Sequence, residues 1–409
     1  MPTDPYFFTS VDDKIIQSDS IRDPLGIQPV WSTIGRRLVP CLSGSAWQIE
    51  GIIAVMAIQG LAEERLRDPA NKDESGYWRL MEGLVEYHLF QTEGREPCHG
   101  KRALEANGEK LELSPNDTRT LCTGLRQYYR GTCVRAGMLD KVYTVNSSWR
   151  DAMNTVFNNH TQAIKKLGKA LNHAIEEQEP VRPAEHFEDL KQQWEALFEN
   201  PEIRELLKQR LLGNTDQTRF ALWAYESRES GNDDTHARFE QIKQESDKEP
   251  WSLANDLEAV FRCAPFISLL ERLLNLLLAL DGDTVEAAAE KLSTTVLREE
   301  GARFLGLRNI DSLNTNRRFR PFFELAEYAN HEEWSKLASQ VIEHHQSVAQ
   351  ERGKKPFIQI DNDQIVVGDP ILGNTKELVD SLKSPEPWHY DFYASVAASI
   401  HGQLYGAQG

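Results

Sequence analysis

The stretch that decides the fold is residues 251–292, WSLANDLEAVFRCAPFISLLERLLNLLLALDGDTVEAAAEKL. Residues 267–280 are almost continuously apolar, and four polar residues interrupt them: Ser268, Glu271, Arg272 and Asn275. A helix that is hydrophobic on nearly every side must be covered on most of its faces. The run is too short for a membrane span and carries a Glu-Arg pair. It therefore predicts a central core helix, and Pro265 is predicted to end or kink a first helix and start a second.

The length and the net charge of the chain limit the classes of protein to which it can belong. A chain of 409 residues is longer than one compact core normally holds, so we expect two or three domains. The 63 acidic residues outnumber the 46 basic ones, which gives a formal net charge of -17. A field of this sign opposes delocalised binding to nucleic acid or to an anionic membrane, but it leaves room for a local basic site.

The five cysteines and the first residues indicate the compartment. The cysteines form no Cys-x-x-Cys pair, and their spacing suits neither a disulfide framework nor a zinc site. The N-terminus lacks the basic and apolar regions of a signal peptide, and no segment reaches the length of a membrane span. We therefore expect a protein of the reducing cytoplasm with no membrane partner.

Apolar spacing predicts helices along most of the chain, so the expected fold class is mainly α, with many helices and two to three domains. Residues 1–45 are expected to be irregular because proline and glycine are dense there. Ser45 is expected to cap a helix over 46–67 that has a one-sided apolar stripe. The further expected helices cover 77–91, 148–175, 184–250, 283–297, 298–307, 331–352, 374–382 and 388–405.

One small sheet and three domains complete the expected architecture. Two apolar runs, 357–360 and 364–367, flank Asp361-Asn362-Asp363, which predicts a β-hairpin near the C-terminus. The expected domains are consecutive segments of the chain: an N-terminal helical domain at 1–147, an acidic helical region at 148–250, and a core helical domain at 251–409 with the hairpin and closing helices.

Residues 113–157 suggest a possible DNA-binding unit. Ser114-Pro115 predicts the start of a helix that runs from about 116 to 136 and ends at Gly137. Residues 141–145 are predicted to form a short strand. This order is compatible with a winged-helix-like unit whose helix presents Arg119, Arg126, Arg130 and Arg135 to DNA. The alternative is a helix pair joined by a β-turn, with these arginines solvated.

Motifs for catalysis, metals and cofactors do not emerge from the sequence. It contains no P-loop, no glycine-rich dinucleotide fingerprint and no Gly-x-Ser-x-Gly elbow. His331 and His345 would lie roughly 20 Å apart along one helix, so they cannot share a metal, and solvated histidines are expected there. The acids of the hairpin lack the lysine of a metal-dependent nuclease. We therefore expect no catalytic residues, no metal and no cofactor.

Arginines are concentrated beside phenylalanines in one segment of this acidic chain. The cluster consists of Arg303, Arg308, Arg317, Arg318 and Arg320, with Phe319, Phe322 and Phe323 nearby. Arginine forms bidentate pairs with phosphate or carboxylate and stacks on aromatic rings. The cluster is therefore a candidate contact with a partner protein or a phosphate backbone. The alternative is internal, with the arginines paired to the acidic helices in 184–250 and 283–300.

Three groups of short patches carry a resemblance: Asp23-Pro24-Leu25-Gly26 with Trp31, Gly35-Arg36-Arg37-Leu38 and Pro40; Tyr128-Tyr129-Arg130-Gly131 with Ala136-Gly137-Met138-Leu139; and Trp388-His389-Tyr390-Asp391-Phe392-Tyr393. They resemble parts of uncharacterised helical proteins of bacterial defence and restriction gene clusters. None is a motif with known chemistry, so no residue role is carried over. The resemblance implies an accessory subunit that acts beside a separately encoded ATPase or nuclease.

The expected function is therefore a non-enzymatic scaffold or adaptor subunit of a multi-protein bacterial complex in anti-phage defence. Its expected partners are other protein subunits encoded in the same operon. The alternative is a DNA-engaging subunit, with a possible nuclease activity, that uses the 116–145 unit or the arginine cluster.

Overall fold

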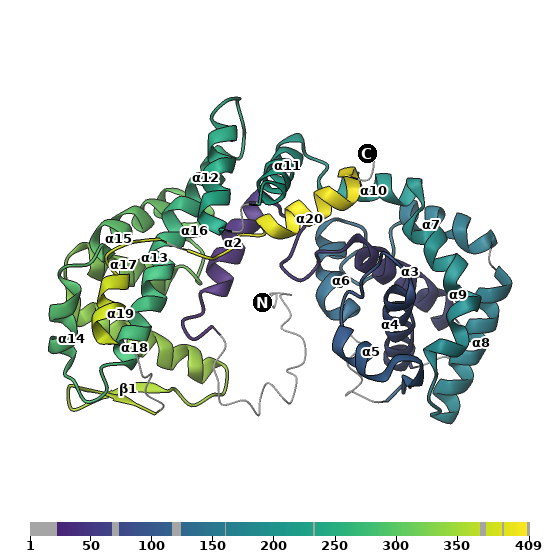
Figure 1. Ribbon diagram of the computed structural model, residues 1–409, viewed down its shortest axis with the longest axis horizontal. Coiled ribbons are helices and arrows are strands. Elements are labelled where there is room, and N and C mark those ends of the chain that lie inside the picture. The colour runs from purple at the N-terminus through teal and green to yellow at the C-terminus, as the bar shows by residue number, and fades with distance from the viewer. Residues whose placement is uncertain are drawn as a thin grey trace. The chain divides into compact units, whose positions relative to one another are not determined.

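The structure is a computed structural model, and helices make up most of it (Figure 1). It describes residues 23–67, 73–116, 124–159, 161–231, 234–368, 374–386 and 388–406. Within these ranges the only sheet is a two-stranded antiparallel hairpin, so the mainly α fold class with a C-terminal hairpin is confirmed. None of the helices in the same ranges is long and apolar enough to cross a membrane.

The chain divides into two compact units, and neither is a continuous stretch. Unit 1 comprises residues 1–38 and 227–392, and unit 2 comprises residues 39–226 and 393–409. Each unit therefore has one short segment that comes from a distant end of the chain. The three consecutive domains expected from the sequence stay a prediction.

Unit 1 is built around the predicted core helix, α13. Its helices are α2 (Gln28–Leu38), α12 (Thr235–Ser246), α13 (Ala254–Leu278), α14 (Val285–Leu292), α15 (Leu297–Leu305), α16 (Asp311–Asn314), α17 (Arg320–Asn330), α18 (Trp334–Glu351) and α19 (Thr375–Ser381), with a 3₁₀ turn, η2, at Gly306–Asn309. Helix α13 packs against α2, α15, α18 and α19. Its residues Leu269, Leu270 and Leu273 are fully buried, so the central core helix is confirmed.

The predicted break at Pro265 is wrong, because α13 continues through it. A proline inside a helix removes one backbone hydrogen bond, yet packing against neighbours can hold the helix together. Here Pro265 is itself buried, between the fully buried Ala264 and Phe266. Tertiary contacts therefore outweigh the lost bond.

Helix α2 lies in the stretch that was predicted to be irregular, so that prediction is wrong. The Asp23 carboxylate accepts hydrogen bonds from the backbone N–H groups of Ile27 at 2.7 Å and Gln28 at 3.1 Å. Pro29 falls in the first turn, where a helix needs no N–H donor. The proline that seemed to break the helix instead lies where helices begin.

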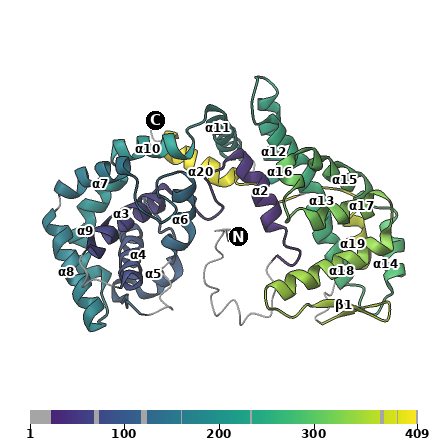
Figure 2. The same ribbon diagram turned by 180° about the vertical axis from the view of Figure 1, so that it is seen from behind.

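The hairpin forms as predicted, from β1 (Ile358–Asp361) and β2 (Gln364–Val367). Asn362 and Asp363 between the strands both have positive φ, at 48° and 63°. That combination is the I′-type turn favoured in two-residue hairpin loops. Residues 281–285 bond along the other edge of β2, and the hairpin packs on α18 (Figure 2).

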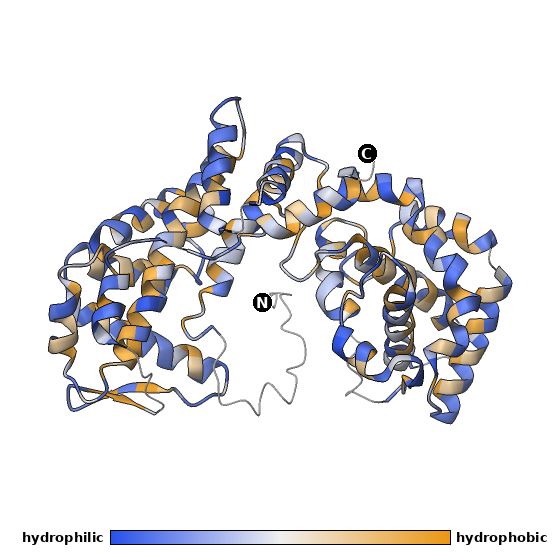
Figure 3. Cartoon of the chain, viewed as in Figure 1, coloured by the Kyte–Doolittle hydropathy of each residue, from blue (hydrophilic) through white to orange (hydrophobic). Residues whose placement is uncertain are grey.

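Unit 2 contains the helices α3 (Ile49–Leu66), α4 (Glu74–Gln91), α5 (Lys101–Asn107), α6 (Leu125–Arg135), α7 (Ser147–Asn159), α8 (Thr161–Glu177), α9 (Pro183–Phe198), α10 (Pro201–Leu211) and α20 (Ala394–Tyr405), while α11 (Thr215–Glu229) spans the unit boundary. Figure 3 shows apolar residues gathered in α3 and α4, whereas α8 and α12 are more hydrophilic. Helix α3 packs against α4, α6, α7 and α9.

Two details of unit 2 differ from the sequence predictions. Helix α3 begins after Gln48, with no side-chain cap, so Ser45 is not its cap. Every residue from 51 to 59 of α3 is buried, which corrects the one-sided stripe. The stretch expected to be one helix over 148–175 is helical in α7 and α8, and residue 160 between them lies outside the described residues. The burial of α3 follows from its contacts on several sides, which sequence spacing cannot show.

No strand forms over 141–145, where Val145 makes only an isolated antiparallel bridge to Leu139, so the structure matches the alternative of a helix pair joined by a turn. Residues 140–144 form a turn in which the Asp140 carboxylate accepts the N–H groups of Val142 at 2.9 Å and Thr144 at 2.7 Å. Tyr143 has a φ of 66°, and Val142 is 78% exposed. Aspartate competes with strand formation by bonding its own following backbone. That local bond outweighs the β propensity of Val142 and Tyr143.

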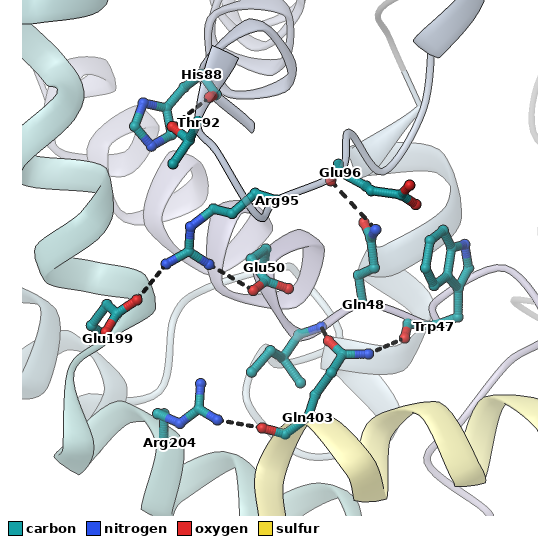
Figure 4. A network of polar contacts seen from close by, with 11 residues as sticks. Trp47, Gln48, Glu50, His88, Thr92, Arg95, Glu96, Glu199, Arg204 and Gln403 are labelled. Carbon is teal, nitrogen blue, oxygen red and sulfur yellow. Dashed lines mark hydrogen bonds and ion pairs between the residues drawn. The ribbon is translucent and has the colours of Figure 1, made fainter. Parts of the chain in front are cut away.

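A polar network holds the last helix, α20, against the start of α3 within unit 2 (Figure 4). The Gln403 side chain accepts the Ile49 N–H at 2.9 Å and donates to the Trp47 carbonyl at 2.8 Å. Arg204 of α10 donates to the Gln403 carbonyl. These bonds explain why a C-terminal helix belongs to a unit formed mostly by residues before 226.

Candidate functional site

Most of the predicted arginine cluster is engaged in local ion pairs. Three pairs form within α15, η2 and α17: Arg303 with Glu300 at 2.9 Å, Arg308 with Glu327 at 2.7 Å, and Arg320 with Glu324 at 3.3 Å. Arg317 is exposed, and the Arg318 N–H bonds to the Asn316 side chain at 3.0 Å. Glu300 belongs to the acidic segment expected to receive these arginines, whereas the other two glutamates lie in α17. The cluster is therefore largely neutralised in place.

The neighbouring phenylalanines belong to the core of unit 1. Phe319, Phe322 and Phe323 are at most 3% exposed. The ring of Phe319 lies 6.0 Å from that of Phe323, and Arg308 covers Phe323 at 5.0 Å. These rings therefore offer no exposed stacking surface to a nucleic acid base.

The candidate DNA-facing arginines of α6 are held by intramolecular contacts. Arg119 lies outside the described residues. Arg126 pairs with Glu74 at 2.7 Å, and its guanidinium lies 5.2 Å from the Trp78 ring centroid. These contacts hold α6 against α4, so this side chain has a structural role.

The other two arginines of the same helix also contact the protein. Arg130 stacks over the ring of Tyr143 at 4.0 Å, and Arg135 donates to the Leu42 carbonyl at 3.2 Å. All three described arginines of α6 are half-buried. DNA binding through this helix stays a prediction, but it would have to compete with these contacts.

Solvated histidines were expected at 331 and 345, and the expectation is confirmed for the exposed His331 but wrong for His345 of α18. His345 is fully buried. The Phe357 N–H donates to its Nε2 at 3.3 Å, so its Nδ1 carries the proton that bonds to the Pro24 carbonyl at 3.0 Å. His344 bonds the Leu25 carbonyl at 2.8 Å. The pair fixes the chain before α2, and burial lowers the pKa of both histidines.

Arg303 also lines a groove in unit 1, which is the candidate functional site. The groove has a volume of about 600 Å³, within the range of binding pockets. Its lining comes from four places in the fold: His236, Glu240 and Lys243 of α12; Glu258, Phe261, Arg262 and Pro265 of α13; Ala302, Arg303 and Gly306 at the end of α15; and Pro385, Glu386 and Trp388 of the C-terminal loop. Sequence analysis identified only Arg303 among these.

Aromatic rings make the apolar part of the groove. Trp388 is nearly buried, and its ring meets those of Phe261 at 6.0 Å and His236 at 5.2 Å, both edge to face. Phe239 supports Trp388 from the core at 5.6 Å. Edge-to-face contacts of this kind fix ring orientation. The apolar surface of the groove is therefore a preformed feature of unit 1.

The charges of the groove balance one another. Lys243 and Arg262 share Glu258, at 3.8 Å and 3.2 Å. His236 lies 3.1 Å from Glu386 and 3.7 Å from Glu240. Ion pairs this exposed are weak and exchange readily with solvent. A ligand can therefore replace them at little energetic cost.

Arg303 is the most available cation of the groove. Its side chain is 65% exposed, whereas its partner Glu300 is 4% exposed. Burial raises the pKa of Glu300, and the Arg303 charge opposes that rise. A guanidinium has five N–H donors, and Glu300 accepts from only one of its nitrogens. Arg303 can therefore hold a second carboxylate.

A second polar cluster, deep in unit 2, was missed by the sequence analysis. Glu82 and Glu86 are one helical turn apart on α4 and are 4% and 0% exposed. Glu82 accepts the N–H groups of Gly124 at 3.1 Å and Arg126 at 2.6 Å. Glu86 accepts the N–H of His99 at 3.1 Å. The sequence signal would have been two acids at i and i+4 inside an otherwise apolar helix.

Burial shifts the pKa values of the groups in this cluster. It raises the pKa of Glu82 to about 7 and that of Glu86 to about 8, although the backbone bonds oppose the shift. It lowers the pKa of His88 and of His99 to about 4. Perturbed groups often mark active sites, but capping roles perturb pKa values as well. Here each glutamate caps backbone N–H groups, so the geometry supports a structural role.

No group of three or more histidine, cysteine, aspartate or glutamate side chains among the described residues is arranged to hold a metal ion. Asp363 of the hairpin accepts the Val285 N–H through its carbonyl at 3.1 Å, and the Asp281 side chain accepts the Val367 N–H at 2.9 Å. These acids therefore support the hairpin. In comparisons with known proteins, no family model, curated protein or solved structure matched the chain.

Proposed function

We propose that the protein is a non-enzymatic scaffold or adaptor subunit of a multi-protein bacterial complex in anti-phage defence. The observation that carries this proposal is the groove of unit 1, where exposed charges surround a preformed aromatic surface. Aromatic residues and arginine are enriched where proteins bind one another. The cytoplasmic setting is expected from the cysteine spacing and the first residues, and the defence context rests on the sequence resemblance.

Two further observations favour contact over catalysis. The most strongly shifted carboxylates, Glu82 and Glu86, cap backbone groups of unit 2. The arginines that were candidates for DNA binding largely contact glutamates, carbonyls or rings of the same chain. A partner protein at the groove therefore accounts for more of the structure than a nucleic acid does.

The test is co-purification of the tagged chain with the products of its neighbouring genes, followed by sedimentation velocity. The variant Arg303→Gln removes a groove charge but keeps a donor for Glu300. The matched control, Arg320→Gln, removes a charge outside the groove whose side chain is 82% exposed. We expect the wild type and the control to sediment as a complex, and Arg303→Gln to lose most of the partner.

The DNA-engaging alternative makes the opposite prediction. It requires a gel shift of short duplexes whose affinity falls steeply with salt. Under the scaffold proposal the purified chain gives no such shift. A salt-dependent shift, or a partner retained equally by Arg303→Gln and Arg320→Gln, would overturn the proposal.

A further inference from the structure

The groove of unit 1 contains equal numbers of opposite charges. Its cations are Lys243, Arg262 and Arg303, and its anions are Glu240, Glu258 and Glu386. A nucleic acid backbone or a free phosphate needs an excess of positive charge, and three carboxylates would repel it. A polypeptide backbone is uncharged, so a balanced lining suits it.

Cations and anions are mixed along the walls of the groove, since Lys243 and Glu240 both come from α12 and Arg262 pairs with Glu258 on α13. Arg262 and Arg303 come from α13 and α15, whereas Glu240 and Glu386 flank His236 on α12 and the C-terminal loop. The exposed guanidinium of Arg303 favours a carboxylate on the α15 side. The ring of Phe261, which is half-buried and held in place by Trp388, favours an apolar or aromatic side chain beside it.

Taken together, we propose that the groove binds a segment of a partner protein in which an acidic residue lies next to an aromatic one. The carboxylate of that segment pairs with Arg303, and its aromatic side chain packs on Phe261. This inference rests on the proposed scaffold function and specifies the chemistry of the partner.

The experiment is a selection of phage-displayed random dodecapeptides on the immobilised full-length chain. We expect the wild type and Arg320→Gln to enrich peptides in which aspartate or glutamate lies next to tryptophan, phenylalanine or tyrosine. A fluorescein-labelled synthetic copy of an enriched peptide should bind Arg303→Gln about tenfold more weakly than wild type. The same peptide should bind Arg320→Gln within about twofold of wild type.

A second variant tests whether a loss of peptide binding comes from a folding defect. Lys243→Gln removes a cation from α12, on another wall of the groove, and its circular dichroism and thermal midpoint are compared with those of Arg303→Gln. Both should fold as wild type, and Lys243→Gln should weaken the peptide less than Arg303→Gln does, because Lys243 lies 4.7 Å from the Phe261 ring and near Glu258.

The inference is overturned if no acidic–aromatic sequence is enriched, if basic peptides are selected, or if Arg303→Gln binds the enriched peptide as tightly as wild type. Binding of a labelled short DNA duplex that is lost in Arg303→Gln would also overturn it. A chain that loses its partner protein through Arg303→Gln but selects no peptide keeps the scaffold function and rejects only the acidic–aromatic segment.

Discussion

Two polar regions of this protein differ in how deeply their side chains are buried, and therefore in the role of those side chains. In unit 2, Glu82 and Glu86 are buried and hold backbone N–H groups of α6 and of the chain before α5. In unit 1, Glu258 forms an exposed ion pair with Arg262 in an open groove, and the exposed Arg303 side chain there pairs with the buried Glu300. Buried polar groups cost free energy unless the fold uses them, whereas exposed charges stay available to a partner. In this protein, the buried polar residues therefore have structural roles, and the exposed charged residues are the candidates for contact with a partner.

The largest expected effect comes from filling space beside the buried region of unit 2. A Cβ on Gly51 of α3 would lie 2.4 Å from the ring of the fully buried Tyr129. Gly51→Ala should lower the free energy of unfolding by about 3 kcal/mol, because the ring cannot move without opening the core. The measurement is urea unfolding followed by circular dichroism.

Gly168 of α8 provides the matched control, because nothing lies within 4 Å of its Cβ position. Gly168→Ala should leave the free energy of unfolding unchanged or raise it by up to about 1 kcal/mol, since alanine favours a helix more than glycine does. Equal losses for the two variants would show that the contact with Tyr129 is not the cause.

A smaller effect is a loss of stability as the pH rises. The folded pKa values of Glu82 and Glu86, about 7 and about 8, exceed the ordinary value of 4.5. The unfolded chain therefore releases these protons at lower pH, and stability falls as the pH rises from the ordinary value to the folded values. His88 and His99 act oppositely, but only between their folded pKa of about 4 and the ordinary value of 6.5.

Above pH 6.5 the glutamates therefore dominate this cluster. We expect the free energy of unfolding to fall by about 2 kcal/mol between pH 6.5 and pH 8. Glu86→Gln keeps an acceptor for the His99 N–H and should remove most of that fall. Thermal unfolding of the wild type and of Glu86→Gln at several pH values measures this loss of stability. An identical pH profile for the two proteins would contradict the assignment of the loss to Glu86.

The smallest expected effect is at the groove. Arg303→Gln should lower the free energy of unfolding by about 1 kcal/mol, because the Arg303 side chain is largely solvated but the buried Glu300 loses its charged partner. Thermal melting measures this directly, beside Arg320→Gln. A loss as large as that of Gly51→Ala would show that Arg303 is structural and would remove the distinction between the two regions.

Some of the fold follows from the sequence because the signals are local. The apolar run in α13 requires burial, and the Asn362-Asp363 turn requires a hairpin. The failures also have local causes: Pro29 lies in a first helical turn, and the Asp140 side chain bonds the turn after it. Whether Pro29 lies in a first helical turn and Asp140 in a turn depends on where each element begins, and the spacing of apolar residues alone does not determine that position.

The candidate site was harder to predict. Arg303 was identified because arginine is unevenly distributed in an acidic chain. His236, Phe261 and Trp388 meet across more than one hundred residues of sequence, and no periodicity links them. Glu82 and Glu86 were detectable as acids in an apolar helix, but their partners at 99 and 124–126 were not.

The measurement that tests the central claim most directly is hydrogen–deuterium exchange of the chain with and without its purified partner. We expect exchange to slow in α12, in the first half of α13, at the end of α15 and at Glu386 and Trp388, which together line the groove. The buried centre of unit 2 should exchange equally in both samples. Protection confined to unit 2, with the groove unchanged, would contradict the assignment of the groove as the contact site.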